Sequence, residues 1–496
     1  MNDTVYDLIN AMSQAEKRYF RRYSNLHSDD KENRYFKLFE LMDKTPHYEP
    51  NTIKIQLKSK YYAQDKRHLY TRLLDSLREF HKNNGAEAKA GKSIGYHMIL
   101  LEKGLKQQAK KELKKATRFA LKQERYDEVI KLMQMETKLL REETDLHILD
   151  NHLATYREQL AKFLNILDQE IQYEQEYLNI VKWNKEIEFA RTPKELNALK
   201  TIMDKPILKE QPKSASTKSK IYFHYIWGLY HFFQGSFTHS TAHFKKQLEV
   251  FNQQSHWKKS QPLMYIRCIG NYYLLNIKQG NTTTHSTLSH FTEIRSPTSH
   301  HKHYIDYLEH TLIIMQWVTQ GAYKKATTFI ENPSNKPNIG ERKPYQEWYL
   351  EWVYACFNSV AAYMGVGNYR MALKHLNYFL NTADANLKQD IYCIGRVLNL
   401  LIHFELENHD LLEYILDSTQ KYLKGKKRLF GFEKAILAFI KSSLGTDLIS
   451  DKNKLLKQLK NQLLPLKNDP FEKNVFAYFD FIEWIDKSIK TKKSLS

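Results

Sequence analysis

The stretch GVGNYRMALKHLNYFL, residues 365–380, places a glycine, a polar turn residue and a tyrosine directly ahead of an amphipathic helix. Apolar residues recur at helical spacing on both sides of the Gly367-Asn368-Tyr369 turn. They are Tyr354, Phe357, Val360, Ala361 and Tyr363 before it, and Ala372, Leu373, Leu376, Phe379 and Leu380 after it. The stretch therefore predicts two helices joined by a tight turn.

The same pattern recurs along the chain. Two close copies have a small and a bulky residue at matching places after the turn: Gly235-Ser236-Phe237 with Ser240 and Phe244, and Gly321-Ala322-Tyr323 with Ala326 and Ile330. Looser copies centre on Gly104 and Glu407, and a weak one on Gly280; the turns from 235 to 407 lie 40 to 46 residues apart. A small residue opposite a bulky one lets paired helices approach closely, and stacked pairs bury a continuous core. This predicts a series of stacked helical hairpins.

The composition agrees with long helices and short joints. The 496 residues include only 16 glycines and 12 prolines, whereas a sheet-rich protein with many tight turns needs more of both. Three widely spaced cysteines suggest a reducing compartment. No apolar run has the length of a signal peptide or a membrane span, so a cytoplasmic protein without membrane insertion is predicted.

The hairpins resemble the tetratricopeptide repeat. The matching positions are Gly228, Ser240 and Phe244; Trp317, Tyr323 and Ala326; and Tyr363, Tyr369 and Ala372. The period exceeds that family's usual length of about 34 residues, no proline closes the units, and bulky Phe379 takes a normally small position. The chain also resembles an uncharacterised family of repeat proteins from the Bacteroidota, through SQAEKRYFRRY near the start and RVLNLLIHFELENHDLLEYILDSTQKYL near the end. That family implies a repeat architecture and no established activity.

The predicted fold is all-α: a right-handed α-solenoid of tetratricopeptide-like hairpins with an N-terminal helical head. Armadillo-like spacing is the structural alternative. The expected divisions are a basic four-helix head over 1–84, long charged hairpins over 85–203, a hinge or loop over 204–220, the solenoid over 221–486 and a basic tail over 487–496. Ser13 and Glu16 form a predicted capping box in the head.

No motif supports an enzyme, so neither a catalytic residue nor a cofactor nor a metal is predicted. GAEAKAGKS, residues 85–93, has five residues between its glycine and GKS, where a phosphate-binding loop has four. His300, His301 and His303 fall in a predicted loop without a nearby cysteine or carboxylate. The pair His239 and His243 lacks the glutamate that a hydrolytic zinc helix places between its histidines. The histidines are interpreted as surface or core residues.

The leading hypothesis is a non-enzymatic scaffold that binds a peptide or partner protein in a solenoid groove. Candidate groove residues are polar and aromatic ones on the first helix of each hairpin: Tyr225, His231, Trp317, Asn358, Tyr363 and His403. The oligomeric state is left open.

The alternative hypothesis is a nucleic-acid-binding regulator, because the net charge is +20. The predicted helix 106–122 has basic residues every fourth position, with Ala109, Leu113, Ala116 and Ala120 along another face. A solvated outer face of a helix explains the same stripe. The basic-surface candidates are Lys17, Arg18, Arg21 and Arg22 in the head, and Lys106, Lys110, Lys114, Arg118 and Lys122 in this helix.

Overall fold

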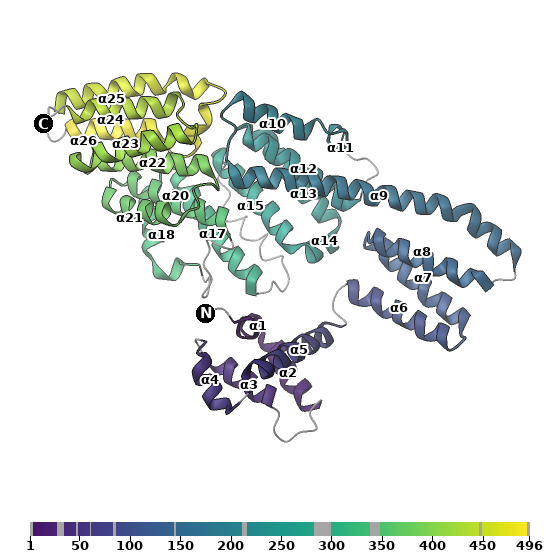
Figure 1. The fold of residues 1–496 in the computed structure, drawn as a ribbon. Helices are drawn as coiled ribbons and strands as arrows, with labels where there is room; N and C mark the ends of the chain where they lie inside the picture. Colours follow the sequence, from purple (N-terminus) through teal and green to yellow (C-terminus); the bar gives the residue numbers. More distant parts are fainter. Residues whose placement is uncertain are drawn as a thin grey trace. The chain divides into compact units, whose positions relative to one another are not determined.

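The computed structural model describes residues 3–26, 34–45, 48–59, 61–82, 86–142, 145–210, 216–281, 299–337, 348–445 and 449–493. All regular secondary structure in these residues is helical, which confirms the all-α prediction. The chain divides into two compact units, residues 1–168 with 298–300 and residues 169–297 with 301–496 (Figure 1). The boundary falls within helix α9 (Leu146–Glu186), a place that the divisions expected from the sequence do not mark.

The first unit begins with five helices where the sequence predicts four, because the residues ahead of Ser13 form a helix of their own. They are α1 (Thr4–Ala11), α2 (Gln14–Leu26), α3 (Arg34–Lys44), α4 (Pro50–Leu57) and α5 (Tyr62–His81). Phe20, Leu38 and Phe39 are fully buried at their centre. The capping box is confirmed, since the Ser13 N–H donates to Glu16 Oε2 at 2.6 Å and the Glu16 N–H donates to Ser13 Oγ at 3.3 Å.

A second core of this unit lies among α6 (Ala86–Glu102), α7 (Lys106–Lys122), α8 (Tyr126–Leu139) and the start of α9, with the short 3-10 helix η1 (Leu140–Glu142) after α8. Helix α7 has the predicted bounds, and its buried residues are the four predicted ones, Ala109, Leu113, Ala116 and Ala120. The small alanines let α7 pack on both α6 and α8. The GKS segment lies inside α6, so its backbone N–H groups are not arranged as a phosphate-binding loop.

The second unit contains the end of α9 and the remaining helices. These are α10 (Pro193–Met203), α11 (Pro206–Lys209), α12 (Thr217–Phe233), α13 (Phe237–Gln253), α14 (Ser255–Ser260), α15 (Pro262–Lys278), α17 (Ser299–Thr319), α18 (Tyr323–Glu331), α20 (Tyr349–Gly365), α21 (Tyr369–Thr382), α22 (Gln389–Glu405), α23 (His409–Gly425), α24 (Gly431–Leu444), α25 (Ile449–Leu463) and α26 (Phe481–Lys493), with 3-10 helices η2 (Pro333–Asn335), η3 (Pro465–Asn468) and η4 (Lys473–Ala477). From α18 to α26 each helix packs on the next described helix, as do α12 with α13 and α13 with α15. One continuous hydrophobic core runs through the unit.

The turns predicted from the repeated pattern share one backbone geometry. Their central residues have left-handed φ angles: +70° at Gly235, +75° at Gly280, +69° at Gly321, +75° at Gly367 and +56° at Glu407. In each turn the next N–H donates back to the carbonyl five residues earlier, as from Asn368 to Tyr363 at 2.9 Å. This hydrogen bond closes the Schellman motif, which satisfies the last carbonyls of a helix. Gly104 has the same geometry, with a φ of +73° and the Leu105 N–H donating to the Leu100 carbonyl at 2.9 Å. The repeated hairpin turn is therefore confirmed at all six predicted places, including the weak copy at Gly280.

Small residues allow the helices of a hairpin to cross closely, as the pattern predicts. A Cβ at Gly228 of α12 would lie 2.8 Å from the ring of Phe244 on α13, closer than side chains approach one another. Ser240 Oγ donates to the Gly228 carbonyl at 2.7 Å across the same crossing. Ala326 and Ala372, the equivalents of Ser240 in later hairpins, are fully buried.

Replacing Gly367 with alanine is expected to lower the free energy of unfolding by about 1 kcal/mol, because an L side chain disfavours the left-handed region. No atom lies within 4 Å of the position of the new Cβ, so the cost comes from the backbone angle alone. Gly425 is a matched control: it ends α23 without a left-handed φ and also faces open space. Gly425→Ala is expected to stabilise by about 0.4–1 kcal/mol. Urea denaturation of both variants checks the opposite signs, and destabilisation of equal size by both contradicts the assigned turn.

Two expected divisions of the second unit differ from the structure. Residues 206–209, expected in a hinge or loop, form the short helix α11, and its Leu208 is buried, with its carbonyl accepting from Trp227 Nε1 at 3.1 Å. Residues 487–493, expected in a tail, continue helix α26, and Ser488 is buried there. Apolar residues at helical spacing in FIEWIDKSI explain why the helix packs this far.

Candidate functional site

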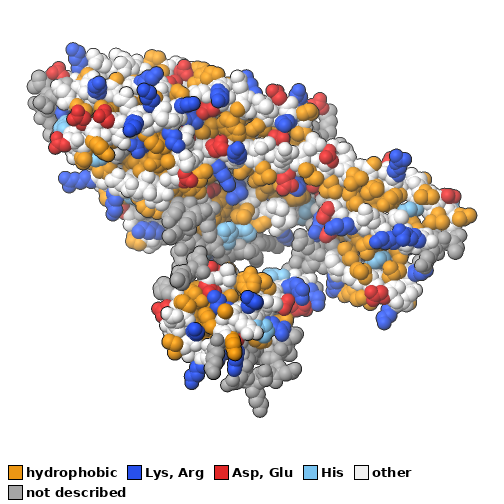
Figure 2. All heavy atoms as spheres, viewed as in Figure 1, with side chains coloured by type: hydrophobic (Ala, Val, Ile, Leu, Met, Phe, Trp, Pro, Cys, Tyr) orange, Lys and Arg blue, Asp and Glu red, His pale blue; other side chains and the backbone are white. Residues whose placement is uncertain are grey.

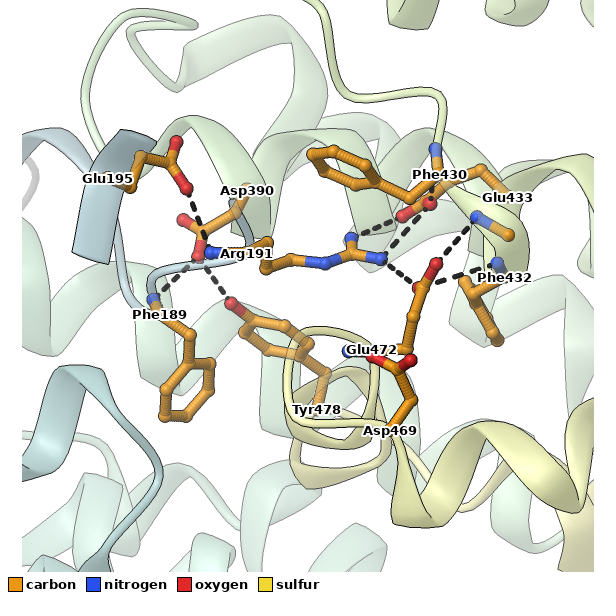
Figure 3. A network of polar contacts seen from close by, with 11 residues as sticks. Phe189, Arg191, Glu195, Asp390, Phe430, Phe432, Glu433, Asp469, Glu472 and Tyr478 are labelled. Carbon is orange, nitrogen blue, oxygen red and sulfur yellow. Dashed lines mark hydrogen bonds and ion pairs between the residues drawn. The ribbon is translucent and has the colours of Figure 1, made fainter. Parts of the chain in front are cut away.

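The most extensive polar network in the described part of the second unit surrounds residues 187–191, sequence IEFAR, which connect α9 to α10 without forming a helix. All five residues are buried, and we call them the strap. Asp390, in the first turn of α22, accepts the N–H groups of Glu188 at 2.9 Å and of Phe189 at 3.0 Å. It also accepts the hydroxyl of Tyr478 at 2.6 Å (Figure 3). A single carboxylate thus holds the backbone of the strap against α22.

The two charged side chains of the strap have opposite charges as partners. Glu188 Oε2 accepts from Lys388 Nζ at 2.6 Å and from Tyr354 Oη at 2.5 Å. At the other end, the guanidinium of Arg191 pairs with Glu433 at 2.5 Å and with Glu472 at 2.7 Å. Buried charges are tolerated only when they are paired and hydrogen-bonded in this way.

Arg191, Glu433 and Glu472, which we call the Arg191 cluster, place opposite charges that stabilise one another in a buried site. Burial raises the pKa of Glu433, and the adjacent Arg191 acts in the opposite direction. The ring of Phe430 lies 4.5 Å from the guanidinium carbon and covers one face of it. Glu472 also accepts the N–H groups at the start of α24, that of Gly431 at 2.6 Å and that of Phe432 at 3.4 Å (Figure 3 shows Glu472 and Phe432). The cluster therefore joins the strap to α24 and to the segment ahead of η4.

A cavity of about 370 Å³ lies beside the strap in the second unit. Its described wall is mostly apolar and comes from α9, α12, α13, α15, α17 and α20, and from Leu387 ahead of α22. The polar exceptions include Arg267 of α15, Glu351 of α20 and Tyr304 of α17, whose hydroxyl donates to Glu351 Oε1 at 2.6 Å. Tyr225, one of the predicted groove residues, also lines this cavity.

A second cavity of about 250 Å³ shares Tyr354 and Met315 with the first one. Glu188 of the strap, Lys278 of α15 and the predicted groove residue Asn358 line it. Burial lowers the pKa of Lys278, whose ammonium lies 5.9 Å from the ring centroids of both Phe189 and Phe237. The first cavity thus lies mainly among the first helices of successive hairpins, whereas residues 476–483 also form part of the wall of the second.

The other four predicted groove residues occupy one equivalent position, four residues before the left-handed turn residue of their hairpins. They are His231, Trp317, Tyr363 and His403. The first two are partly exposed. Tyr363 and His403 are buried, and their side chains contact their own hairpin turn or the preceding helix: Tyr363 Oη donates to Glu331 at 3.2 Å, and His403 Nδ1 lies 3.0 Å from Asn408 Nδ2. These two side chains therefore make packing contacts within the second unit, and their role in partner binding stays a prediction.

Histidines of α12 and α13 gather at one side of their hairpin. Nδ1 of His224 lies 3.2 Å from Nδ1 of His243, and the ring of His231 lies near those of His239 and His243. Burial lowers the pKa of His224 to about 4 and that of His243 to about 3. These two side chains are therefore neutral near pH 7. His300, His301 and His303 lie at the start of α17 and not in a loop.

The basic-surface candidates of the first unit fall into two groups. Lys17 is buried and its ammonium lies 2.7 Å from Asp43, and Arg21 pairs with both Glu40 and Asp43. Both cations are paired with carboxylates of their own chain, but the Arg21 side chain keeps 34% of its surface exposed whereas Lys17 is buried. The others remain accessible: Arg18, Arg22, Lys106, Lys114, Arg118 and Lys122 are exposed, and Lys110 is half-buried. On the face of the second unit in Figure 2, Lys and Arg side chains lie scattered among Asp and Glu side chains.

Within the described residues there is no group of three or more His, Cys, Asp or Glu side chains that could hold a metal ion. Nor does this part of the chain contain a helix both long and apolar enough to cross a membrane. No protein-family model matches the chain, and no curated protein matches it. The packed helices are compatible with a helical repeat protein, and the resemblances drawn from the sequence remain predictions.

Proposed function

We propose that the protein is a non-enzymatic scaffold whose second unit, a right-handed α-solenoid of tetratricopeptide-like hairpins, holds a peptide or a segment of a partner protein. The single observation that carries the proposal is the strap. The hairpins already bind a non-helical segment of their own chain through a carboxylate on its backbone N–H groups, a buried phenylalanine and two charge pairs. These are the means by which grooves recognise peptides.

Further features support this proposal. His231 and Trp317 occupy equivalent positions in two hairpins and keep part of their surface exposed. Partly exposed aromatic side chains are suited to anchor a bound segment. The proposed location is the cytoplasm, which is supported by three free, buried cysteines.

The test supplies the strap from outside. In the full chain, residues 187–191 are replaced by GSGSG, and a fluorescein-labelled peptide with the sequence NKEIEFARTPK, residues 184–194, is titrated in and followed by fluorescence anisotropy. We expect saturable binding to the variant and at least tenfold weaker binding to the parent protein, whose own strap occupies the site. The control peptide NKEISSARTPK, which lacks the glutamate and phenylalanine side chains, is expected to bind the variant at least tenfold more weakly.

A second variant with a smaller change serves as the peptide-binding protein, the recipient, if the GSGSG variant does not fold. Phe189→Ala keeps the strap backbone and its hydrogen bonds to Asp390 but removes the buried ring. Circular dichroism establishes that each recipient is folded. If a folded recipient binds the two peptides equally, or binds neither, the surface has no capacity to recognise a segment and the proposal fails.

The alternative, a nucleic-acid-binding regulator, is supported by the exposed stripe of α7. Lys114, Arg118 and Lys122 are exposed there, on a different face from the buried alanines. A gel shift across a salt series compares the parent protein with the triple variant Lys110→Glu, Lys114→Glu and Arg118→Glu. Binding that weakens steeply with salt and is lost in the variant supports this alternative, and no shift at low salt removes it.

A further inference from the structure

The cavity of about 370 Å³ contains Arg267, whose charge interacts with Glu351 of the same wall without forming an ion pair with it. Arg267 lies on α15 between the fully buried residues Ile266 and Cys268, yet its own side chain is exposed because it lines the cavity. Among the described residues no carboxylate forms an ion pair with it. Glu351, the acidic residue of the cavity wall, instead accepts the hydroxyl of Tyr304 at 2.6 Å.

Two buried arginines of the same unit differ from Arg267 in this respect. Arg191 pairs with Glu433 and Glu472, and Arg428 pairs with Glu195 at 2.7 Å. Both are buried, and each meets the carboxylate that a desolvated guanidinium requires. Arg267 instead interacts electrostatically with Tyr304, Tyr225, Glu351 and Tyr177, and it hydrogen-bonds the side chains of Tyr177 and Tyr304. The guanidinium N–H groups that these two tyrosines leave unused can bind an anion that enters the cavity.

The remainder of the wall defines what such an anion must carry. Leu229, Phe232, Leu274, Leu308, Leu312 and Met315 supply apolar surface. Asn271 adds an amide, and the charged lining residues are two cations, Arg267 and Lys185, against the single anion Glu351. A volume near the lower end of the usual range for ligand sites, about 300–1,000 Å³, suits a small molecule.

We propose that this cavity binds a small organic acid, in which a carboxylate that pairs with Arg267 is joined to an apolar body of aromatic size. The apolar body lies against the leucine side chains of α15 and α17, and the guanidinium donates two parallel N–H hydrogen bonds to the carboxylate. This site is separate from the strap site, since the strap contributes no residue to its described wall.

The test uses 4-phenylbutyrate and its uncharged amide, 4-phenylbutanamide, with the full chain and saturation-transfer NMR titration. We expect the acid to bind with a dissociation constant in the millimolar range, as a ligand of this size allows, and the amide about ten- to a hundredfold more weakly, because it lacks the charge-assisted hydrogen bonds. Arg267→Gln is expected to reduce the affinity for the acid by the same factor and to leave that for the amide unchanged. Arg370→Gln, an exposed arginine on α21, is the matched control and should bind as the parent does.

A second variant tests the cavity without touching the arginine. Leu274→Trp replaces a half-buried residue of the wall with a larger side chain and leaves Arg267 in place. We expect it to reduce the affinity for the acid at least tenfold. The proposal is overturned if the acid does not bind at about 10 mM, if acid and amide bind equally, or if folded Arg267→Gln retains the affinity of the parent. A third probe, an acetylated peptide ending in phenylalanine, separates the sources of a carboxylate: tighter binding of the peptide than of the free acid overturns the assignment to a small molecule.

Discussion

Arg191→Met is expected to lower the free energy of unfolding of the second unit by about 3–5 kcal/mol. The substitution leaves Glu433, which is fully buried, without the cation that compensates its charge. Breaking one partner of a buried ion pair costs more than the pair contributes, because the remaining charge cannot be solvated. Urea denaturation followed by circular dichroism, compared with the parent protein, measures the loss.

The control for this prediction is Arg370→Gln, an arginine that is exposed on α21 of the same unit. A surface change of this kind is expected to alter the free energy of unfolding by no more than about 0.5 kcal/mol. The double variant Arg191→Met with Glu433→Gln is expected to recover part of the loss, since it removes both charges. A double variant less stable than Arg191→Met alone contradicts the view that the stranded carboxylate is the cause.

The hairpins could be predicted from the sequence because their signals are local. A glycine that adopts a left-handed φ, a small residue five positions later and apolar residues at helical spacing all fall within about 30 residues of one another. Helix α7 is an example of what such local signals predict, because its bounds and all four of its buried residues agree with the prediction. The predicted superhelical progression depends on the rotation between hairpins, and no short pattern of residues specifies that rotation.

The strap could not be predicted because its partners are distant in the sequence. Asp390 and Glu433 lie in the first turns of their helices. An acidic residue at that position is ordinarily exposed and interacts favourably with the helix dipole. No feature of residues 187–191 predicts that they bind Asp390 and Glu433, which lie some 200 residues or more further along the chain. One local signal was available, since Thr192-Pro193 begins a helix and so implies a break after α9.

Aromatic residues at the predicted groove positions differ in how much of their surface is buried. Tyr363 and Trp317 occupy the same position in their hairpins, but Tyr363 is buried and Trp317 is partly exposed. Burial at one repeat position thus varies with the neighbouring hairpin. The pattern within a single copy does not contain this information.

Asp390→Ala is expected to lower the free energy of unfolding by about 3–5 kcal/mol, since it strands the N–H groups of Glu188 and Phe189 and the Tyr478 hydroxyl in a buried site. Amide hydrogen exchange of the strap is expected to accelerate before exchange in the flanking helices does, because the lost acceptor serves the strap backbone directly. Exchange measured by mass spectrometry over residues 187–191 distinguishes this local release from general unfolding.

Asp410→Ala is the matched control, because Asp410 is also the second residue of its helix, α23, but is exposed. Its removal costs only the interaction of one carboxylate with the helix N-terminus, about 0.3–1 kcal/mol. If both alanine variants cost the same and leave exchange in the strap unchanged, Asp390 acts only at its helix terminus and the strap is held by its side chains. If Asp390→Ala alone releases the strap, the strength with which the hairpins hold this segment is set by one carboxylate, and a competing peptide must satisfy the same carboxylate to displace it.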